Sequence, residues 1–240
     1  LREAGERGDP LTAGRIRHLL AVSSLATDDV TGAFTLLDQA SGGLHARSTL
    51  SALTESLSRS CVHLYRGDVD ACAETYEAFD KAFGTALASV PFWRSILVLM
   101  RARSALLVDA GAGGDAKWLA HAARAVADVE KIGLPCFADD ARMLRACLAV
   151  SRQQPSAALA ELEPLVRSLL ATSDSRHATL IALFAQRAYG QLVGGAEGQH
   201  HVSRAEAWIG QRGIVHARRF ARLFLPGLEE RARALVPPVT

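Results

Sequence analysis

The residues best placed to do chemistry in this sequence are arginines that recur at a fixed spacing. Five short segments align, each beginning with arginine and reaching leucine or valine five residues later. Successive arginines are 42, 44, 42 and 42 residues apart, and the segments begin at Arg17, Arg59, Arg103, Arg145 and Arg187. A guanidinium binds carboxylate and phosphate groups through paired hydrogen bonds. This row of arginines therefore predicts, in one interpretation, a surface that binds an acidic peptide or a phosphate.

Two interpretations of this arginine row are open at the level of sequence. In the first, the arginines bind a partner, and the candidate partner-binding residues are Arg59, Arg103, Arg145 and Arg187. In the second, each arginine pairs with a carboxylate of its own or the adjacent unit and fixes the spacing of the units. Repetition in every unit favours the structural interpretation, because a ligand rarely needs all five arginines equally.

Other motifs do not predict catalysis or metal binding. The glycine-rich stretch at 111–114 lacks the lysine of a phosphate-binding loop and follows a predicted helix. His200 and His201 are consecutive, as are the acid pairs at 139–140 and 229–230, and consecutive residues on a helix point about 100° apart. No serine, cysteine or threonine has a histidine at a suitable spacing for nucleophilic catalysis. We expect no catalytic, cofactor-binding or metal-binding residue, and no enzymatic activity in this chain.

A basic amphipathic stretch at 212–222 has two interpretations. Its arginines surround apolar residues such as Phe220 and Leu223, a pattern that serves nucleic acids, membrane surfaces or acidic partners. The alternative is a capping helix with its apolar side on the protein and its arginines in water. The net charge of only +2 and the acids at 229–230 favour the cap. We therefore expect no direct contact with nucleic acid or membrane.

The composition predicts an all-α protein. Hydrophobic residues make up 49% of the chain, mostly alanine and leucine, and aromatic residues only 6%, which favours helix packing over sheet. The four cysteines form no CxxC pair, so we expect reduced thiols, no zinc and a cytoplasmic location. No apolar run is long enough to span a membrane. The chain starts without methionine, and we interpret it as a fragment of a longer protein.

Helical hairpins are the elements that must position the arginine row. Between 135 and 171, one apolar stripe runs through Phe137, Ala141, Leu144 and Leu148, and a second follows Pro155. The same pattern in every unit predicts a right-handed, two-layer, tetratricopeptide-like solenoid of about five hairpins in a single domain, 1–240. We expect repeats near 10–45, 46–88, 89–133, 134–172 and 173–213. A cap at 214–240 would contain a helix over 217–225 and a polar piece over 228–235.

The C-terminal part also resembles a known family. Ala205, Trp208, Ile209, the pair Gly213-Ile214, Arg218, Arg219 and Leu225-Pro226-Gly227 are similar to the ending of the tetratricopeptide-like region in large bacterial signalling proteins. The ending is similar to that of multidomain serine/threonine protein kinases with an ATPase module, and the array of helical hairpins also resembles, more distantly, that of maltose-type transcription activators. The resemblance implies a non-catalytic region that lies C-terminal to a kinase and an ATPase. This chain itself contains no Walker-type loop and no kinase catalytic-loop motif.

From these features we expect a protein-interaction or regulatory module, with a protein or peptide partner docked in the groove of the first helices. The alternative is a small-effector-sensing domain of a transcription activator, which predicts an enclosed apolar pocket lined by Trp93, Trp118 or Tyr76. A third interpretation, an enzyme, predicts converging titratable groups with shifted pKa values. The sequence leaves the partner's identity and the oligomeric state open.

Overall fold

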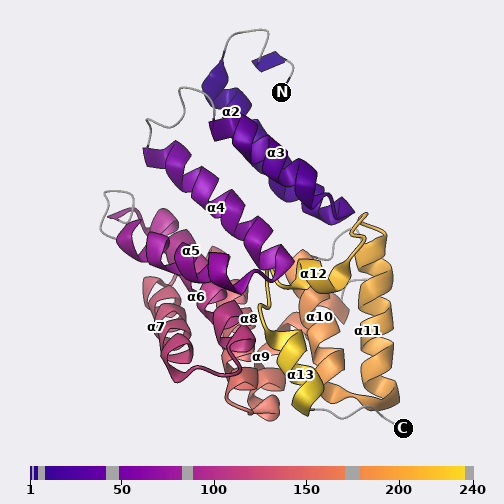
Figure 1. The fold of residues 1–240 in the computed structure, drawn as a ribbon. Coiled ribbons are helices and arrows are strands. Elements are labelled where there is room, and N and C mark those ends of the chain that lie inside the picture. The colour runs from indigo at the N-terminus through magenta and orange to yellow at the C-terminus, as the bar shows by residue number, and fades with distance from the viewer. Residues whose placement is uncertain (2, 5–8, 42–48, 83–88, 171–178, 236–240) are drawn as a thin grey trace.

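The chain is all-α in the computed structural model, which describes every residue except 2, 5–8, 42–48, 83–88, 171–178 and 236–240 (Figure 1). Five first helices are α2 (Pro10–Ser24), α4 (Thr49–Arg66), α6 (Pro91–Gly111), α8 (Ala138–Ser151) and α10 (Leu180–Val193). Five second helices are α3 (Val30–Ser41), α5 (Val69–Ala82), α7 (Ala116–Ile132), α9 (Pro155–Leu170) and α11 (Gly195–Gly210). Two short helices, α12 (Ala217–Ala221) and α13 (Leu228–Leu235), complete the described chain. The all-α class predicted from composition is confirmed.

Local sequence signals set several helix starts. The side chain of Asp115 accepts a hydrogen bond from the backbone N–H of Lys117 at the start of α7, and Asp68 caps α5 in a similar way. Pro91 opens α6, and Pro135 opens a 3-10 turn, η4 (Pro135–Phe137), that leads into α8. At the start of α10 the side chain of Thr179 accepts a hydrogen bond from the backbone N–H of Ala182.

The five helix pairs pack in sequence order. Each first helix contacts its own second helix, and from α4 onward it also contacts the second helix of the preceding pair. The repeated arginines all lie on first helices, six to eight residues before the last residue of the helix. The residue five positions after the arginine is buried in the four later first helices: Leu64, Val108, Val150 and Leu192. The periodicity in the sequence therefore corresponds to equivalent positions on the helices.

Two glycines permit a close crossing of α10 and α11. A Cβ atom on Gly198 would lie 2.3 Å from the carbonyl oxygen of Gly190, and one on Gly190 would lie 2.5 Å from the carbonyl oxygen of Gly198. These are backbone atoms, which cannot rotate away as a side chain can. The small residues therefore set the distance between the two helices.

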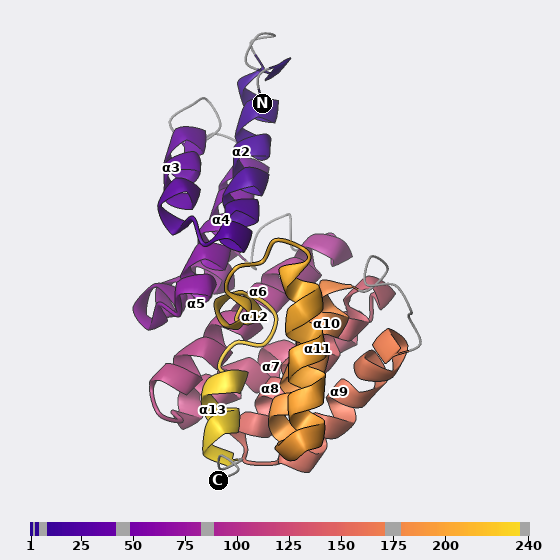
Figure 2. The ribbon, with the colours of Figure 1, turned by 90° about the vertical axis from the view of Figure 1, so that its right-hand side faces the viewer.

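The C-terminal segment, residues 214–235, turns back across the first helices (Figure 2). Its helices contact α4, α6, α8 and α10. The helix predicted over 217–225 ends already at Ala221, and turns carry the chain to Gly227, whose φ is +74°. A Cβ on Gly227 would lie 2.5 Å from Cβ of Ala110 on α6. The stretch at 228–235, expected to be a polar piece, is helix α13 and buries Leu228, Glu229 and Ala232.

Candidate functional site

Of the five repeated arginines, Arg17 is half-buried on α2, and the other four differ in exposure. Arg59 and Arg145 are the more accessible of these four. Each has a side chain that is 32% exposed. Arg59 donates to Asp38 of α3 at 2.8 Å and to Glu55 at 3.0 Å. Arg145 donates to Glu161 of α9 at 2.7 Å and also to Glu130 of α7. Both arginines therefore link their first helix to the second helix of the preceding pair.

Arg103 and Arg187 are less exposed, with side chains that are 15% and 8% exposed. Arg103 lies 2.5 Å from Asp140 of α8, and burial raises the pKa of Asp140 although Arg103 opposes the shift. Arg187 donates to Glu206 of α11 at 2.9 Å and to the buried Glu229 of α13, and burial lowers its pKa. These contacts match the structural interpretation of the row. A partner-binding role stays a prediction, and the exposed fractions favour Arg59 and Arg145 for it.

The C-terminal segment places arginines at the carboxyl ends of three first helices. Arg222 donates to the carbonyl of Tyr65 at 3.2 Å. Arg231 donates to the carbonyls of Asp109 and Ser151 at 2.8 and 3.4 Å. Each of these carbonyls belongs to the residue six positions after a repeated arginine. The carboxyl end of a helix carries partial negative charge, so the two guanidiniums stabilise three equivalent helix ends at once.

Arg231 has a second, buried partner. Its Nη2 lies 2.7 Å from Oδ2 of Asp109, and the Asp109 side chain is fully buried. Neither carboxylate oxygen of Asp109 has another hydrogen-bond partner among the described residues. Arg231 is thus the group that compensates the buried charge of Asp109.

Asp28 joins the first helix pair to the C-terminal segment. Tyr65 donates its hydroxyl to Asp28 at 2.7 Å, Arg219 donates at 2.9 Å, and Nε2 of His216 lies 3.1 Å away. The Tyr65 hydrogen bond lowers the pKa of Asp28, and Arg219 and His216 lower it further. Burial and Asp28 together raise the pKa of Tyr65, so the phenol keeps its proton and remains a donor.

We expect Asp28→Asn to remove part of the acid sensitivity of the fold. The folded pKa of Asp28 lies below its unfolded value of about 3.9. Asp28 therefore contributes stability above that pH, and this contribution is lost as the pH falls through the folded pKa. Urea unfolding at several pH values between about 5 and 2 should give a shallower slope for Asp28→Asn than for wild type. Glu77→Gln, an exposed carboxylate change on α5, is the matched control. Equal slopes for all three proteins would contradict the role of Asp28.

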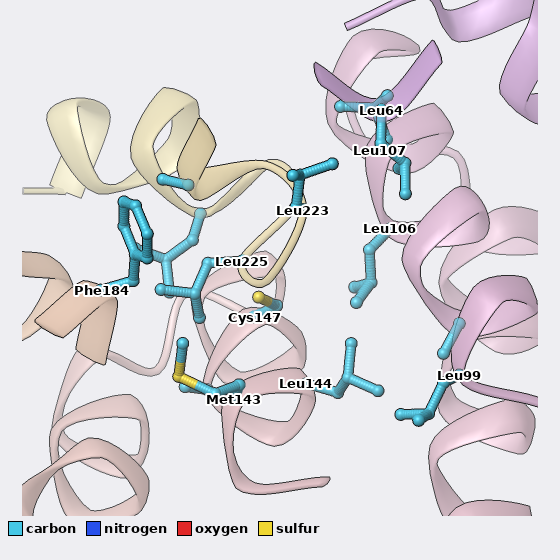
Figure 3. Packing of buried hydrophobic residues seen from close by; sticks show 14 of the residues in the cluster. Leu64, Leu99, Leu106, Leu107, Met143, Leu144, Cys147, Phe184, Leu223 and Leu225 are labelled. Carbon is cyan, nitrogen blue, oxygen red and sulfur yellow. The ribbon is translucent and has the colours of Figure 1, made fainter. Parts of the chain in front are cut away.

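The C-terminal segment is deeply buried through its own apolar side chains. Figure 3 shows Leu223 and Leu225 pointing toward side chains of α6, α8 and α10, among them Leu106, Cys147 and Phe184. Leu225 is 2% exposed, and the rings of Phe224 and Phe184 stack with centroids 5.2 Å apart. The basic stretch at 212–222 thus puts its apolar side on the helices as expected for a cap, but Arg222 points inward rather than into water.

The residues named for an effector pocket are only partly brought together. The rings of Tyr76 and Trp118 meet edge to face at 5.3 Å, whereas the ring contact of Trp93 is with Phe92. Oη of Tyr76 lies 2.8 Å from Nδ1 of His121 and accepts from Arg101 at 3.3 Å. Burial and neighbouring cations lower the pKa of His121. This is a packed aromatic cluster with a polar edge.

Two cavities adjoin the arginine row. One of about 300 Å³ lies beside Arg145, between the end of α7 and the start of α8, and its apolar lining includes Val129 and Phe137. The other, of about 530 Å³, lies between α10, α11 and the start of the C-terminal segment, and its lining includes Arg187 and Arg218. Both volumes are in the range that holds a side chain or a small ligand.

The remaining sequence motifs add no site. The glycines at 113–114 lie in the turn between α6 and α7. Within the described residues, no group of three or more His, Cys, Asp or Glu side chains is arranged to hold a metal ion, and no helix is both long and apolar enough to cross a bilayer. Comparison with protein-family models, curated proteins and solved structures found no match for this chain.

Proposed function

We propose that this chain is a non-catalytic, tetratricopeptide-like interaction module of a larger bacterial regulator. Its five helix pairs would form a right-handed, two-layer solenoid with repeats near the boundaries given above and a cap at 214–240. The sequence resembles the C-terminal region of multidomain serine/threonine kinases, and such a kinase is the parent protein that we propose. The four free thiols are compatible with a reducing, cytoplasmic location.

One observation carries the proposal, namely the equivalence of the first helices. The arginines occupy matching positions, and the carbonyls six residues later accept hydrogen bonds from the C-terminal segment in three of the units. Stacked equivalent units are the architecture that many proteins use to present an extended binding surface. The C-terminal segment binds the carboxyl ends of three first helices.

The docking position that we propose is the 300 Å³ cavity beside Arg145. Apolar residues such as Val129 and Phe137 line it together with Glu130, Arg142 and Arg145. Arg145 is held between Glu130 and Glu161 but remains 32% exposed. A partner peptide with an apolar side chain next to an acidic one would fill the cavity and reach the guanidinium.

Separate replacement of Arg59 and Arg145 by alanine should weaken partner binding and leave the fold intact. Each arginine forms partly exposed ion pairs, which contribute roughly 0–1 kcal/mol. The melting temperature should therefore change by no more than about 2–4 °C. The binding measurement is a quantitative pull-down from bacterial lysate with wild-type and variant baits. At least one retained protein should be lost with Arg145→Ala.

Arg167→Ala is the matched control, because Arg167 is 70% exposed and pairs with Glu163 on α9, outside the row. It should retain the same proteins as wild type. Loss of binding by Arg167→Ala to the same extent, or no protein sensitive to Arg145→Ala, would contradict the proposed docking position.

The 530 Å³ cavity supports a second candidate, a small-effector-sensing domain of a transcription activator. Its lining combines apolar residues such as Ile209 with Arg218, whose nearest carboxylate oxygens are 3.9 Å away. A small organic anion would fit this lining. Thermal stabilisation by such an anion that Arg218→Gln abolishes would favour the sensor over the interaction module.

A further inference from the structure

The larger of the two cavities described above, of about 530 Å³, is lined by three parts of the chain. Arg187 comes from α10, Ile209 and Gly210 come from the end of α11, and residues 214–219 belong to the start of the C-terminal segment. A molecule bound in this cavity therefore contacts the C-terminal segment and the α10–α11 pair at the same time.

Two of the three arginines in this lining already have carboxylate partners. Arg187 donates to Glu206 at 2.9 Å and to the buried Glu229. Arg219 donates to Asp28 at 2.9 Å. The charges of these two guanidiniums are therefore compensated within the protein.

Arg218 is the arginine of the lining that donates no hydrogen bond to a carboxylate of the described residues. Its Nε lies 3.9 Å from Glu229 and its Nη2 lies 3.9 Å from Glu230, which is beyond hydrogen-bond distance. Glu230 instead accepts a hydrogen bond from Arg222 at 3.0 Å. Because only Arg218 remains available, the lining matches an anion with a single negative charge. A dianion such as phosphate would bring excess negative charge close to Glu229.

An exposed apolar side chain in the same lining indicates the chemistry of the rest of the ligand. Val215 is 62% exposed, whereas Ile209 and Ile214 of the lining are 0% and 6% exposed. The backbone N–H of Val215 donates to the carbonyl of Ala26 at 2.8 Å, which ties this residue to the first helix pair. A hydrocarbon group placed against Val215 would remove apolar surface from water.

From the free guanidinium and the exposed valine we infer that this cavity binds an organic monocarboxylate with an apolar body. The carboxylate accepts paired hydrogen bonds from Arg218, as the planar guanidinium favours, and the apolar body covers Val215. The bound anion also holds the C-terminal segment against α10 and α11, because the lining includes all three. This inference rests on the second candidate function, the effector-sensing domain, and names its ligand class and its structural consequence.

Isothermal titration calorimetry of the full chain with acetate, hexanoate and octanoate tests the ligand class. We expect the affinity to rise with chain length, by up to about fourfold for each methylene that becomes buried. 1-Octanol, which has no charge, and inorganic phosphate, which has no apolar body, should both bind more weakly than octanoate.

Two substitutions separate the contributions of the head group and the chain. Arg218→Gln should weaken octanoate binding by at least about tenfold and leave 1-octanol binding unchanged, which also shows that the variant is folded. Val215→Ser should weaken the binding of octanoate but not that of acetate. Arg167→Gln is the matched control, because Arg167 is 70% exposed on α9 and lies outside the lining.

Hydrogen exchange of α13 tests the structural consequence, since this helix does not line the cavity. Saturating octanoate should slow exchange of the α13 amides several-fold in wild type and should have no effect in Arg218→Gln.

Three results would overturn the inference. The first is absence of saturable octanoate binding, or octanoate binding that Arg218→Gln does not weaken. The second is phosphate binding that Arg218→Gln abolishes with no dependence on chain length among the carboxylates, which would leave a sensor of a different ligand class. The third is octanoate binding without slower exchange of α13. Arg145→Ala should not change octanoate binding, so these outcomes are independent of the docking position proposed beside Arg145.

Discussion

Arg231→Met is expected to destabilise the protein by about 3–5 kcal/mol, the cost of leaving a buried charge without its partner. Asp109 is fully buried, and Nη2 of Arg231 lies 2.7 Å from its carboxylate. The substitution keeps most of the side-chain length and removes only the guanidinium. It also removes the hydrogen bonds to the carbonyls of Asp109 and Ser151. In a chain of this size the melting temperature should fall by roughly 6–20 °C.

Two further variants separate the ion pair from a general effect on α13. Arg233→Met makes the same change on an exposed residue of this helix and should change the free energy of unfolding by about 0.5 kcal/mol or less. Asp109→Asn combined with Arg231→Met removes the buried charge and should recover part of the stability. Urea unfolding of the four proteins measures these differences. If Arg231→Met behaves like Arg233→Met, the assignment of Arg231 as the compensating group is wrong.

The second large effect is expected for Arg187→Met, at about 3 kcal/mol. Arg187 is 8% exposed at its side chain and pairs with Glu229, whose side chain is 4% exposed. Without the guanidinium, the Glu229 carboxylate is left buried with Arg218 only at 3.9 Å. The double change Arg187→Met and Glu229→Leu should restore most of the loss, because apolar residues of similar size replace buried ion pairs at little cost.

Arg145→Met is the matched comparison, since it is the same substitution at the equivalent repeat position. Its ion pairs are partly exposed, so the loss should be roughly 0–1 kcal/mol. Thermal or urea unfolding of both variants gives the comparison directly. Equal losses for Arg145→Met and Arg187→Met would show that burial does not distinguish the members of the row.

The expected losses of stability assign different roles to different arginines of the row. The members that pair with the C-terminal segment or with a buried acid are expected to hold the helices in place. Arg59 and Arg145 remain half-buried and reach the surface, and these are the residues for which partner binding is worth testing first. A repeated residue type thus need not have one role throughout the array.

The sequence by itself was sufficient to predict the five helix pairs and the spacing of their arginines, but not the helices of the C-terminal segment. Alanine and leucine at helical intervals predict amphipathic helices, and Asp115 and Pro91 mark helix starts through local chemistry. The 42-residue spacing predicts equivalent arginine positions, which the first helices display. These features depend on contacts within a few residues or on a fixed period, so a linear sequence contains them.

The course of the C-terminal segment was decided only by the tertiary structure. Asp28 and Arg219 are 191 residues apart and are joined by a hydrogen bond, and nothing in the local sequence of either residue indicates the other. The same holds for Asp109 with Arg231 and for Arg187 with Glu229. Whether a charged side chain is buried depends on how helices from distant parts of the sequence pack around it. The sequence therefore specifies the helices and the spacing of the arginines, and the packing of the helices determines which of these arginines are buried and which stay partly exposed.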